Sequence, residues 1–344
     1  MKKTLLIILL LPSFVFAQIV KGRVQDAQTN YPIEAADVFI DQTSIGTNSN
    51  SSGRFELDTK GAKQQLIINA FGYHQQTVSI ENASNEYLIK LEPKAEELQE
   101  IVIDAALFTR EQLLKTFKYF FLGDSTNGKK STILNEDDLL LYYDKEQRML
   151  VCESSKPIGV HNKNLGYNVI FYLNEAKITF RKQSINPEDY QQAFIFGHTS
   201  FIDLSKNEKE YRKQRNKTFE AAVNPFWLAF LNNTLKEQHY YFYVNGMVIN
   251  LEEYFSTEPD GEDFKVTLIQ EPKLKLFRSF EPLPFNVNKI VNRKEQKSFF
   301  HVVQKEIYIN KNGFVLNPQA IVYGGYFGNL KIADMLPTNY QLQK

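Results

Sequence analysis

Short runs of alternating apolar and polar residues, each closed by turn residues, occupy the first quarter of this chain. Between Ile19 and Pro93 the apolar positions recur every second residue, as in Ala36–Ile40 and Ser52–Leu57. A period of two is typical of a strand that buries one face, and short strands at this spacing build antiparallel sheets. The pattern predicts a β-sandwich over residues 18–93.

The residues that fill and close these runs follow a recognisable order. They are Gly22-x-Val24-x-Asp26, Pro32-Ile33-x-Ala35-Ala36-x-Val38-x-Ile40, Thr43-x-x-Gly46-Thr47, Gly53-x-Phe55-x-Leu57 and Ala70-x-Gly72-Tyr73. Together they resemble the carboxypeptidase-regulatory-like domain, a transthyretin-like sandwich of seven strands that is common in envelope proteins of Gram-negative bacteria. The resemblance implies an architecture without catalytic residues of its own, which serves as a spacer or docking unit.

The N-terminus has the order of a secretory signal peptide. Met1–Lys3 is positively charged, Thr4–Leu11 is apolar, and Val15–Ala17 places an aliphatic and a small residue at the −3 and −1 positions. We predict residues 1–17 to be a leader cleaved before Gln18. A membrane anchor is the alternative, but roughly ten apolar residues are too few to cross ~30 Å of hydrocarbon, which takes about 20. No later stretch reaches that length, so we expect no transmembrane segment in the mature chain.

Residues 94–106 are predicted to be a linker between two domains. The stretch from Pro93 to Glu100 is acidic, and Glu97–Ile103 ends in an apolar run. That run is either the last strand beside the linker or a strand to which a partner adds by β-augmentation. We expect the first of these.

From 107 to 344 the pattern becomes mixed, which favours an α+β domain with an antiparallel sheet and a few helices. A helix is predicted to begin at Thr109, which forms a capping box with Gln112. A second helical stretch is predicted from about 206 to 236, where Pro225 marks a break or a new first turn. The strand-like runs are Leu139–Tyr143, Met149–Glu153, Tyr167–Leu173, Ala176–Phe180, Phe194–Phe201, Tyr240–Val244, Met247–Asn250, Phe264–Gln270, Phe299–Ile309 and Phe314–Tyr323. The predicted fold is therefore mainly β.

Several short motifs of this second domain look familiar as a set. They are Phe121-Leu122-Gly123-x-Ser125, Asn162-x-x-Leu165-Gly166-Tyr167, Gly197-His198-Thr199-Ser200-Phe201, Arg212-x-x-Arg215 and Ala333-Asp334-Met335-Leu336-Pro337. The set resembles uncharacterised envelope proteins that carry the same N-terminal sandwich. The resemblance implies no activity.

Composition excludes several classes of protein. The 40 Lys and Arg residues balance 40 Asp and Glu, so the chain lacks the positive charge of a nucleic-acid binder. A hydrophobic content of 43% is enough to fold. A single Cys excludes an intramolecular disulfide, a cysteine-based zinc site and an iron–sulfur cluster.

The first domain's name suggests a zinc carboxypeptidase, which needs two His and a Glu on zinc in a spacing such as His-x-x-Glu. The five histidines are His74, His161, His198, His239 and His301. None has Glu three residues later or His four residues later, so that activity is not expected.

Two candidate nucleophiles are better explained as structural residues. Ser200 lies near His198, but the sequence around it lacks the second glycine of a nucleophile elbow, and we predict a strand that carries a half-buried His198. Cys152 lies within a strand-like run, and we predict a small hydrophobic residue of the core.

Charged clusters have alternatives that the sequence leaves open. Carboxylates gather at Glu136–Asp138 and Glu258–Asp263, where glycoside hydrolysis or calcium binding is possible in principle, but solvated turns are expected. Asp260-Gly261 suits a hairpin turn. The basic run Lys206–Lys217 is predicted to be an exposed helical face, with a site for lipid headgroups or another anionic partner as the alternative.

We therefore predict no catalytic, cofactor-binding or metal-ligating residue and no cofactor. The chain is predicted to be a non-enzymatic binding or scaffold protein of the Gram-negative envelope, in the periplasm or at the periplasmic face of the outer membrane. Its partner is expected to be an envelope protein, first of all an outer-membrane barrel of an assembly or transport machine, by analogy alone. The alternative is a periplasmic hydrolase that acts on peptide or polysaccharide through the C-terminal domain. A small-molecule or glycan ligand stays open.

Two structural observations distinguish these functions. An enzyme requires a pocket that gathers His and carboxylate groups with shifted pKa values. A binding module is expected to present an exposed strand edge or an apolar patch.

Overall fold

The computed structural model describes residues 19–342, apart from 61, 63–64, 81–85, 95–106, 208, 245, 273–283 and 292–293. The described residues form two compact units, the first within 19–40 and 45–94 and the second within 41–44 and 107–342. The predicted leader and residues 95–106 of the predicted linker lie outside the described residues. None of the helices in the described part of the chain combines the length and apolar character that crossing a membrane requires.

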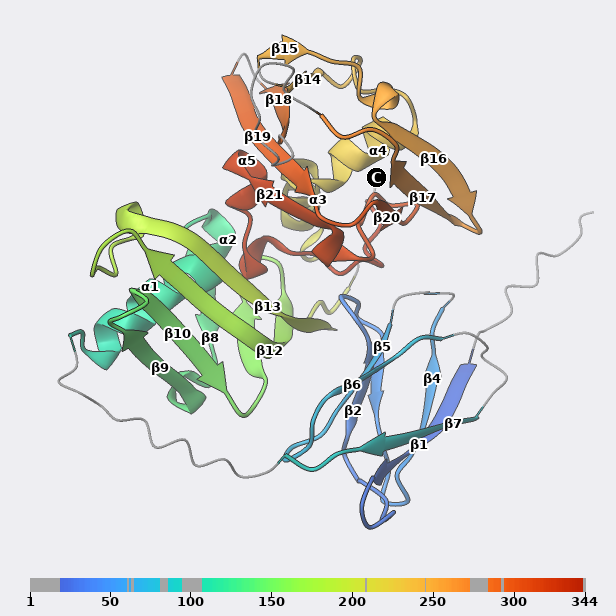
Figure 1. The fold of residues 1–344 in the computed structure, drawn as a ribbon. Helices are drawn as coiled ribbons and strands as arrows, with labels where there is room; N and C mark the ends of the chain where they lie inside the picture. Colours follow the sequence, from blue (N-terminus) through green and yellow to red (C-terminus); the bar gives the residue numbers. More distant parts are fainter. Residues whose placement is uncertain are drawn as a thin grey trace, which may run out of the picture. The chain divides into compact units, whose positions relative to one another are not determined.

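The first unit is a β-sandwich whose seven described strands form two sheets (Figure 1). In the sheet β4-β1-β7, β1 (Ile19–Asp26) pairs antiparallel with β4 (Arg54–Asp58) and parallel with β7 (Glu86–Leu91). The sheet β3-β2-β5-β6 consists of β2 (Asp37–Ile40), β3 (Gly46–Asn48), β5 (Leu66–Asn69) and β6 (Gln76–Val78). Alternate residues of β1 and β4 are buried in one apolar cluster with residues of β2 and β5. The predicted sandwich is confirmed.

The second unit begins with a six-stranded sheet of order β8-β11-β12-β10-β9, with β13 paired to the free side of β12. Its strands are β8 (Ser131–Ile133), β9 (Leu139–Asp144), β10 (Met149–Ser154), β11 (Ile158–Asn162), β12 (Tyr167–Phe180) and β13 (Tyr190–Asp203). All of its neighbouring strands are antiparallel. The long hairpin of β12 and β13 replaces three separate strands of the prediction.

Helix α1 (Arg110–Leu122) packs on one face of this sheet (Figure 1). It begins with the predicted capping box, in which the Thr109 side chain accepts from the Gln112 N–H and the Gln112 side chain accepts from the Thr109 N–H. The side chains that recur at helical spacing are buried, among them Phe117 and Phe121. The short helix α2 (Thr126–Lys129) follows.

The remainder of the second unit forms a second core between two further sheets. One sheet is β15-β14-β18-β19-β21, from β14 (Tyr240–Val244), β15 (Met247–Val248), β18 (Phe285–Val291), β19 (Lys294–Val302) and β21 (Ile321–Gly324). The other is β16-β17-β20, from β16 (Phe255–Asp260), β17 (Asp263–Leu268) and β20 (Glu306–Ile309). The predicted turn at Asp260-Gly261 joins β16 to β17. Trp227 is fully buried in this core, and α5 (Gly325–Gly328) follows β21.

Three predicted elements of this unit are interrupted. The expected strand Phe299–Ile309 is divided between β19 and β20, with no strand at 303–305. The expected helix from about 206 to 236 is two helices, α3 (Arg212–Ala221) and α4 (Asn224–Leu231). They separate because Ala222 is extended, with ψ −176°, and Pro225 in the first turn of α4 lacks the N–H that a continuous helix needs. The expected strand Phe314–Tyr323 contains a short 3₁₀-helix, Pro318–Ala320, before β21.

Arg215 is the exception to the predicted exposed face of the basic run, whose lysines at 206, 209, 213 and 217 are exposed as predicted. It is buried on α3, and its guanidinium donates to the Leu165 carbonyl at 2.8 Å, the Gly166 carbonyl at 3.1 Å and both carboxylate oxygens of Asp203 at 2.8 and 2.9 Å. It also lies 3.9 Å from the centroid of the Tyr167 ring. Partial burial raises the pKa of Asp203, but hydrogen bonds from Arg215 and Ser205 outweigh it and hold that pKa below its ordinary value. The Asp203 carboxylate is therefore charged at neutral pH. Arg215 joins α3 to the end of β13 through this carboxylate, and to the loop before β12 through the two carbonyl groups.

Replacing Arg215 should weaken the second unit. We expect Arg215→Ala to lower the free energy of unfolding by about 3 kcal/mol, because it leaves buried carbonyl groups without donors and removes the partner of Asp203. Lys213→Ala on the exposed side of the same helix is the control, with an expected change within about 0.5 kcal/mol. Chemical denaturation followed by Trp227 fluorescence measures both. Equal effects of the two substitutions would contradict this role of Arg215.

Candidate functional site

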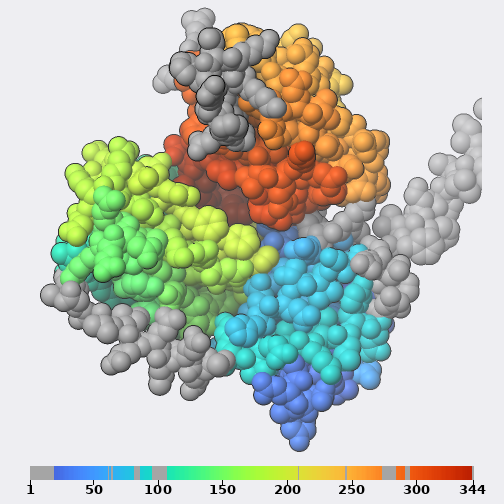
Figure 2. Space-filling view, viewed as in Figure 1, coloured from blue at the N-terminus to red at the C-terminus, as the bar shows by residue number. Residues whose placement is uncertain are grey.

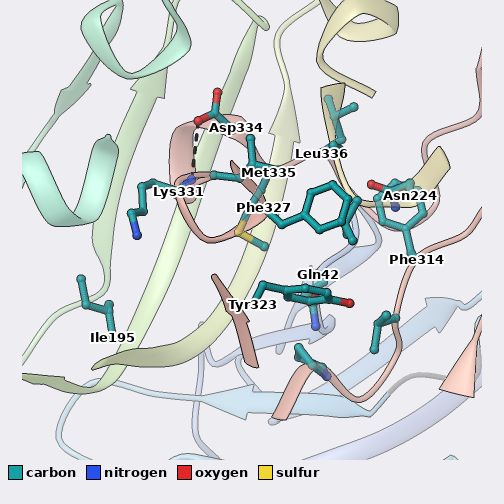
Figure 3. Close-up of a pocket in the computed structure, with 15 residues that line it drawn as sticks. Gln42, Ile195, Asn224, Phe314, Tyr323, Phe327, Lys331, Asp334, Met335 and Leu336 are labelled. Atoms are coloured by element: carbon teal, nitrogen blue, oxygen red, sulfur yellow. Dashed lines mark hydrogen bonds between the residues drawn. The ribbon is translucent and has the colours of Figure 1, made fainter. Parts of the chain in front are cut away.

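A cavity of about 450 Å³ opens within the second unit (Figure 3). Residues 222–224 between α3 and α4, the segment 314–318, β21 with α5, and the C-terminal segment 330–336 supply most of its wall. Gln42 and Ile195 complete it. The cavity thus gathers residues that are far apart in the sequence.

One wall of the cavity is aromatic. Phe314, Tyr323 and Phe327 line it, and the rings of Tyr323 and Phe327 meet edge to face with centroids 6.1 Å apart. The Tyr323 hydroxyl accepts from the Trp227 indole N–H at 2.8 Å, which fixes the ring. Burial raises the pKa of Tyr323, so this hydroxyl is neutral. The wall suits an apolar side chain or another flat apolar group.

Lys331 adds a cation to this apolar wall. Its ammonium donates to the Gly328 carbonyl at 2.8 Å, and burial lowers its pKa. Within the described part of the chain, no carboxylate forms an ion pair with it. In Figure 3 its side chain extends away from the aromatic rings, on the side of the cavity where Ile195 lies. This end of the cavity can therefore accept a carbonyl or anionic group.

Asp334 holds the segment that carries Lys331. One of its carboxylate oxygens accepts from the Ser125 hydroxyl and from the Asn127 amide, each at 2.8 Å. The other accepts a long hydrogen bond, 3.5 Å, from the Lys331 main-chain N–H. Asp334 is buried, so these donors compensate for its lost hydration. Its role is to position the cavity wall.

The motifs that suggested related envelope proteins meet around this carboxylate. Ser125 caps α2 and bonds to Asp334, and the Asn162 amide donates to the Ala333 carbonyl at 2.8 Å. A Cβ on Gly123 would lie 3.1 Å from the Lys331 side chain, so glycine allows the close approach. These residues were recognised as motifs in the sequence, but nothing in the sequence indicated that they lie together in one site.

The edge of β13 runs beside the cavity through Ile195. On this edge, Gln42 N–H donates to the Thr199 carbonyl at 2.8 Å and Phe201 N–H donates to the Thr43 carbonyl at 2.9 Å. From Ala193 to Gly197, no backbone partner on this side occurs among the residues described. Phe194 and Phe196 are 45% and 39% exposed on the outer face of the strand.

His198 lies in β13 and is half-buried, as its strand pattern predicts. Its Nδ1 lies 2.9 Å from a carboxylate oxygen of Asp41, whose second oxygen accepts from the Thr199 N–H at 3.0 Å. Ser200 has the same orientation two residues later, but no hydrogen bond joins it to His198 in the described part of the chain. The geometry is that of a histidine fixed by a carboxylate.

The remaining candidates are dispersed. Cys152 is buried in β10 within the first core of the second unit. Asp138 pairs with Lys156 at 2.9 Å, and hydrogen bonds from Lys156 and Asn135 lower its pKa. Asp260 begins a hairpin turn on another sheet. Across the described residues, no three His, Cys, Asp or Glu side chains gather as a metal site would require.

Comparison with known proteins identifies the first unit. A family model described as the CarboxypepD_reg-like domain matches residues 20–103. The match confirms the resemblance of the N-terminal sandwich and ends at residue 103, before α1 and the sheets of the second unit. Among proteins with curated descriptions, none matches the chain.

The thiol of Cys152 should be unreactive in the folded chain. Burial raises its pKa to about 12, so only roughly 10⁻⁴ of it is thiolate at pH 8. We expect no reaction with an aromatic disulfide reagent over an hour in native buffer and one equivalent per chain in 6 M guanidinium chloride. Absorbance of the released thiol measures this. Rapid native reaction would contradict the burial of this side chain.

Proposed function

We propose that this chain is a non-enzymatic binding or scaffold protein of the cell envelope, and that its second unit holds the partner. One observation carries the proposal: an apolar cavity, a lysine ammonium and an open strand edge lie together. Apolar walls with a few polar groups are typical of recognition sites. An open edge supplies main-chain hydrogen bonds to a partner.

The chemistry of the wall favours binding over hydrolysis. Its ionisable side chains are Lys331, Asp334 and Tyr323, and the wall contains no histidine. Asp334 already accepts hydrogen bonds from Ser125 and Asn127, which leaves it poorly placed to take a proton from water. The competing proposal, a periplasmic hydrolase of peptide or polysaccharide, draws no support from these groups.

The proposed location rests on the N-terminal part of the chain. Residues 1–17 have the order of a secretory leader. The sandwich that follows matches the CarboxypepD_reg-like domain, and its resemblance to that family implies an envelope protein. We place the protein in the periplasm or at the periplasmic face of the outer membrane. There the sandwich acts as a docking or spacing unit, and an outer-membrane barrel of an assembly or transport machine is the proposed partner.

Co-purification tests this proposal. A tagged copy at native expression, solubilised gently from whole envelopes, should recover one outer-membrane protein in stoichiometric amount, identified by mass spectrometry. Leu330→Trp, which adds bulk at the cavity wall, should reduce that recovery at least ~10-fold, because the indole projects into space that a partner side chain would fill. Val322→Trp is the matched control, since Val322 is 55% exposed and does not line the cavity.

Two results would contradict the proposed function. One is a chain that emerges alone and soluble from the envelopes at native expression. The other is turnover of a peptide or polysaccharide substrate that Leu330→Trp abolishes and Val322→Trp preserves.

A further inference from the structure

A short extended segment already pairs with the edge of β13. Thr43 forms a parallel bridge with Ser200, and the hydrogen bonds of Gln42 and Thr43 with Thr199 and Phe201 flank it. The segment belongs to the second unit and pairs with β13 no further than Gln42. This edge is thus suited to strand addition, and residues 42–43 already pair with the part of it from Thr199 to Phe201.

The backbone groups of β13 continue the open edge past the position where Gln42 pairs. Alternate residues of a strand direct their N–H and C=O groups to the same side. Since Thr199 and Phe201 direct theirs away from β12, so do Gly197, Ile195 and Ala193. The hairpin has two register shifts. The one between Leu173 and Glu175 adds its extra residue to β12, and the one after Thr179 adds Gln191 to β13, outside the stretch from Ala193 to Phe201, so the alternation along that stretch is intact.

The cavity lies where an added strand would place a side chain. Ile195 of the open edge and Gln42 at the end of the paired segment both line it. A residue paired opposite Ile195 directs its side chain to the same face of the sheet as Ile195 does. That side chain would enter the cavity beside the aromatic wall.

The outer face of β13 is apolar beside the same positions. The rings of Phe194 and Phe196 stack with centroids 6.2 Å apart and are substantially exposed. Figure 2 shows this part of the chain, in yellow-green, at the molecular surface. The neighbours of the buried residue on an added strand would contact these two rings. The site therefore fits apolar residues on both faces of the added strand.

We propose that the edge of β13 from Ala193 to Gly197 takes an extended segment of a partner protein as an added strand, with one bulky apolar side chain in the cavity and its neighbours against Phe194 and Phe196. The inference rests on the proposed binding function and names the chemistry of the partner. Recognition combines main-chain hydrogen bonds, which any sequence supplies, with a cavity that selects one side chain.

Ala193→Pro isolates the contribution of the edge. Proline lacks the N–H donor, and its ring covers the edge, while the N–H that it removes points away from β12. The ladder between β12 and β13 should therefore persist. Gln192→Ala, on the outward face of the same strand, is the control. Equal thermal midpoints of the two variants and the wild type establish that the fold is retained.

The experiment selects displayed random decapeptides on the purified protein and measures the anisotropy of the recovered peptides after labelling. We expect peptides that contain three successive apolar residues, bind Gln192→Ala as they bind the wild type, and bind Ala193→Pro and Leu330→Trp at least ~10-fold more weakly. The proposal is overturned if no peptide is recovered. It is also overturned if a folded Ala193→Pro binds the recovered peptides normally.

The same variants separate this inference from the proposed function. If the envelope partner co-purifies with wild type and with Ala193→Pro alike, the binding function stands and the strand-addition site is wrong. If no partner co-purifies with the wild type, the binding function itself fails.

Discussion

The buried carboxylate of Asp334 is the constraint on which the candidate site depends. It accepts hydrogen bonds from Ser125 and Asn127 at the start of α2, and so ties the C-terminal segment to the first core of the second unit. Residues 330–336 line the cavity only because this segment is held in place. A buried carboxylate whose donors were lost would carry a large desolvation cost, so these contacts are expected to form together.

Arg215 holds the long hairpin of the sheet in place through buried polar contacts, as Asp334 holds the C-terminal segment. It binds carbonyl groups in the loop before β12 and the carboxylate at the end of β13, so both ends of the long hairpin are fixed to α3. The hairpin then presents the edge of β13 beside the cavity, and residues 42–43 pair with one part of that edge. The cavity and the edge therefore depend on two buried polar residues, Asp334 and Arg215, which do not belong to the apolar cores.

Local patterns predicted the fold to the extent that one face of each element is apolar. The sandwich, the capping box of α1 and the turn at Asp260-Gly261 are short-range features, and the structure contains all three. Arg215 was misread because its neighbours are Lys and Arg, although Phe219 four residues later marks the buried face of the same helix. The cavity was not predictable, since Ile195 and Lys331 meet only through tertiary packing.

Hydrogen exchange resolved to single residues along β13 tests the central claim most directly. In the free protein, the amides of Ala193 and Gly197 should exchange near the rate of an unstructured chain, while those of Phe194 and Phe196, bonded to β12, are protected. Binding of the partner or of a selected peptide should then protect the amides of Ala193 and Gly197. Uniform protection of all four amides in the free protein would contradict an open edge, and so would an unchanged pattern in the complex.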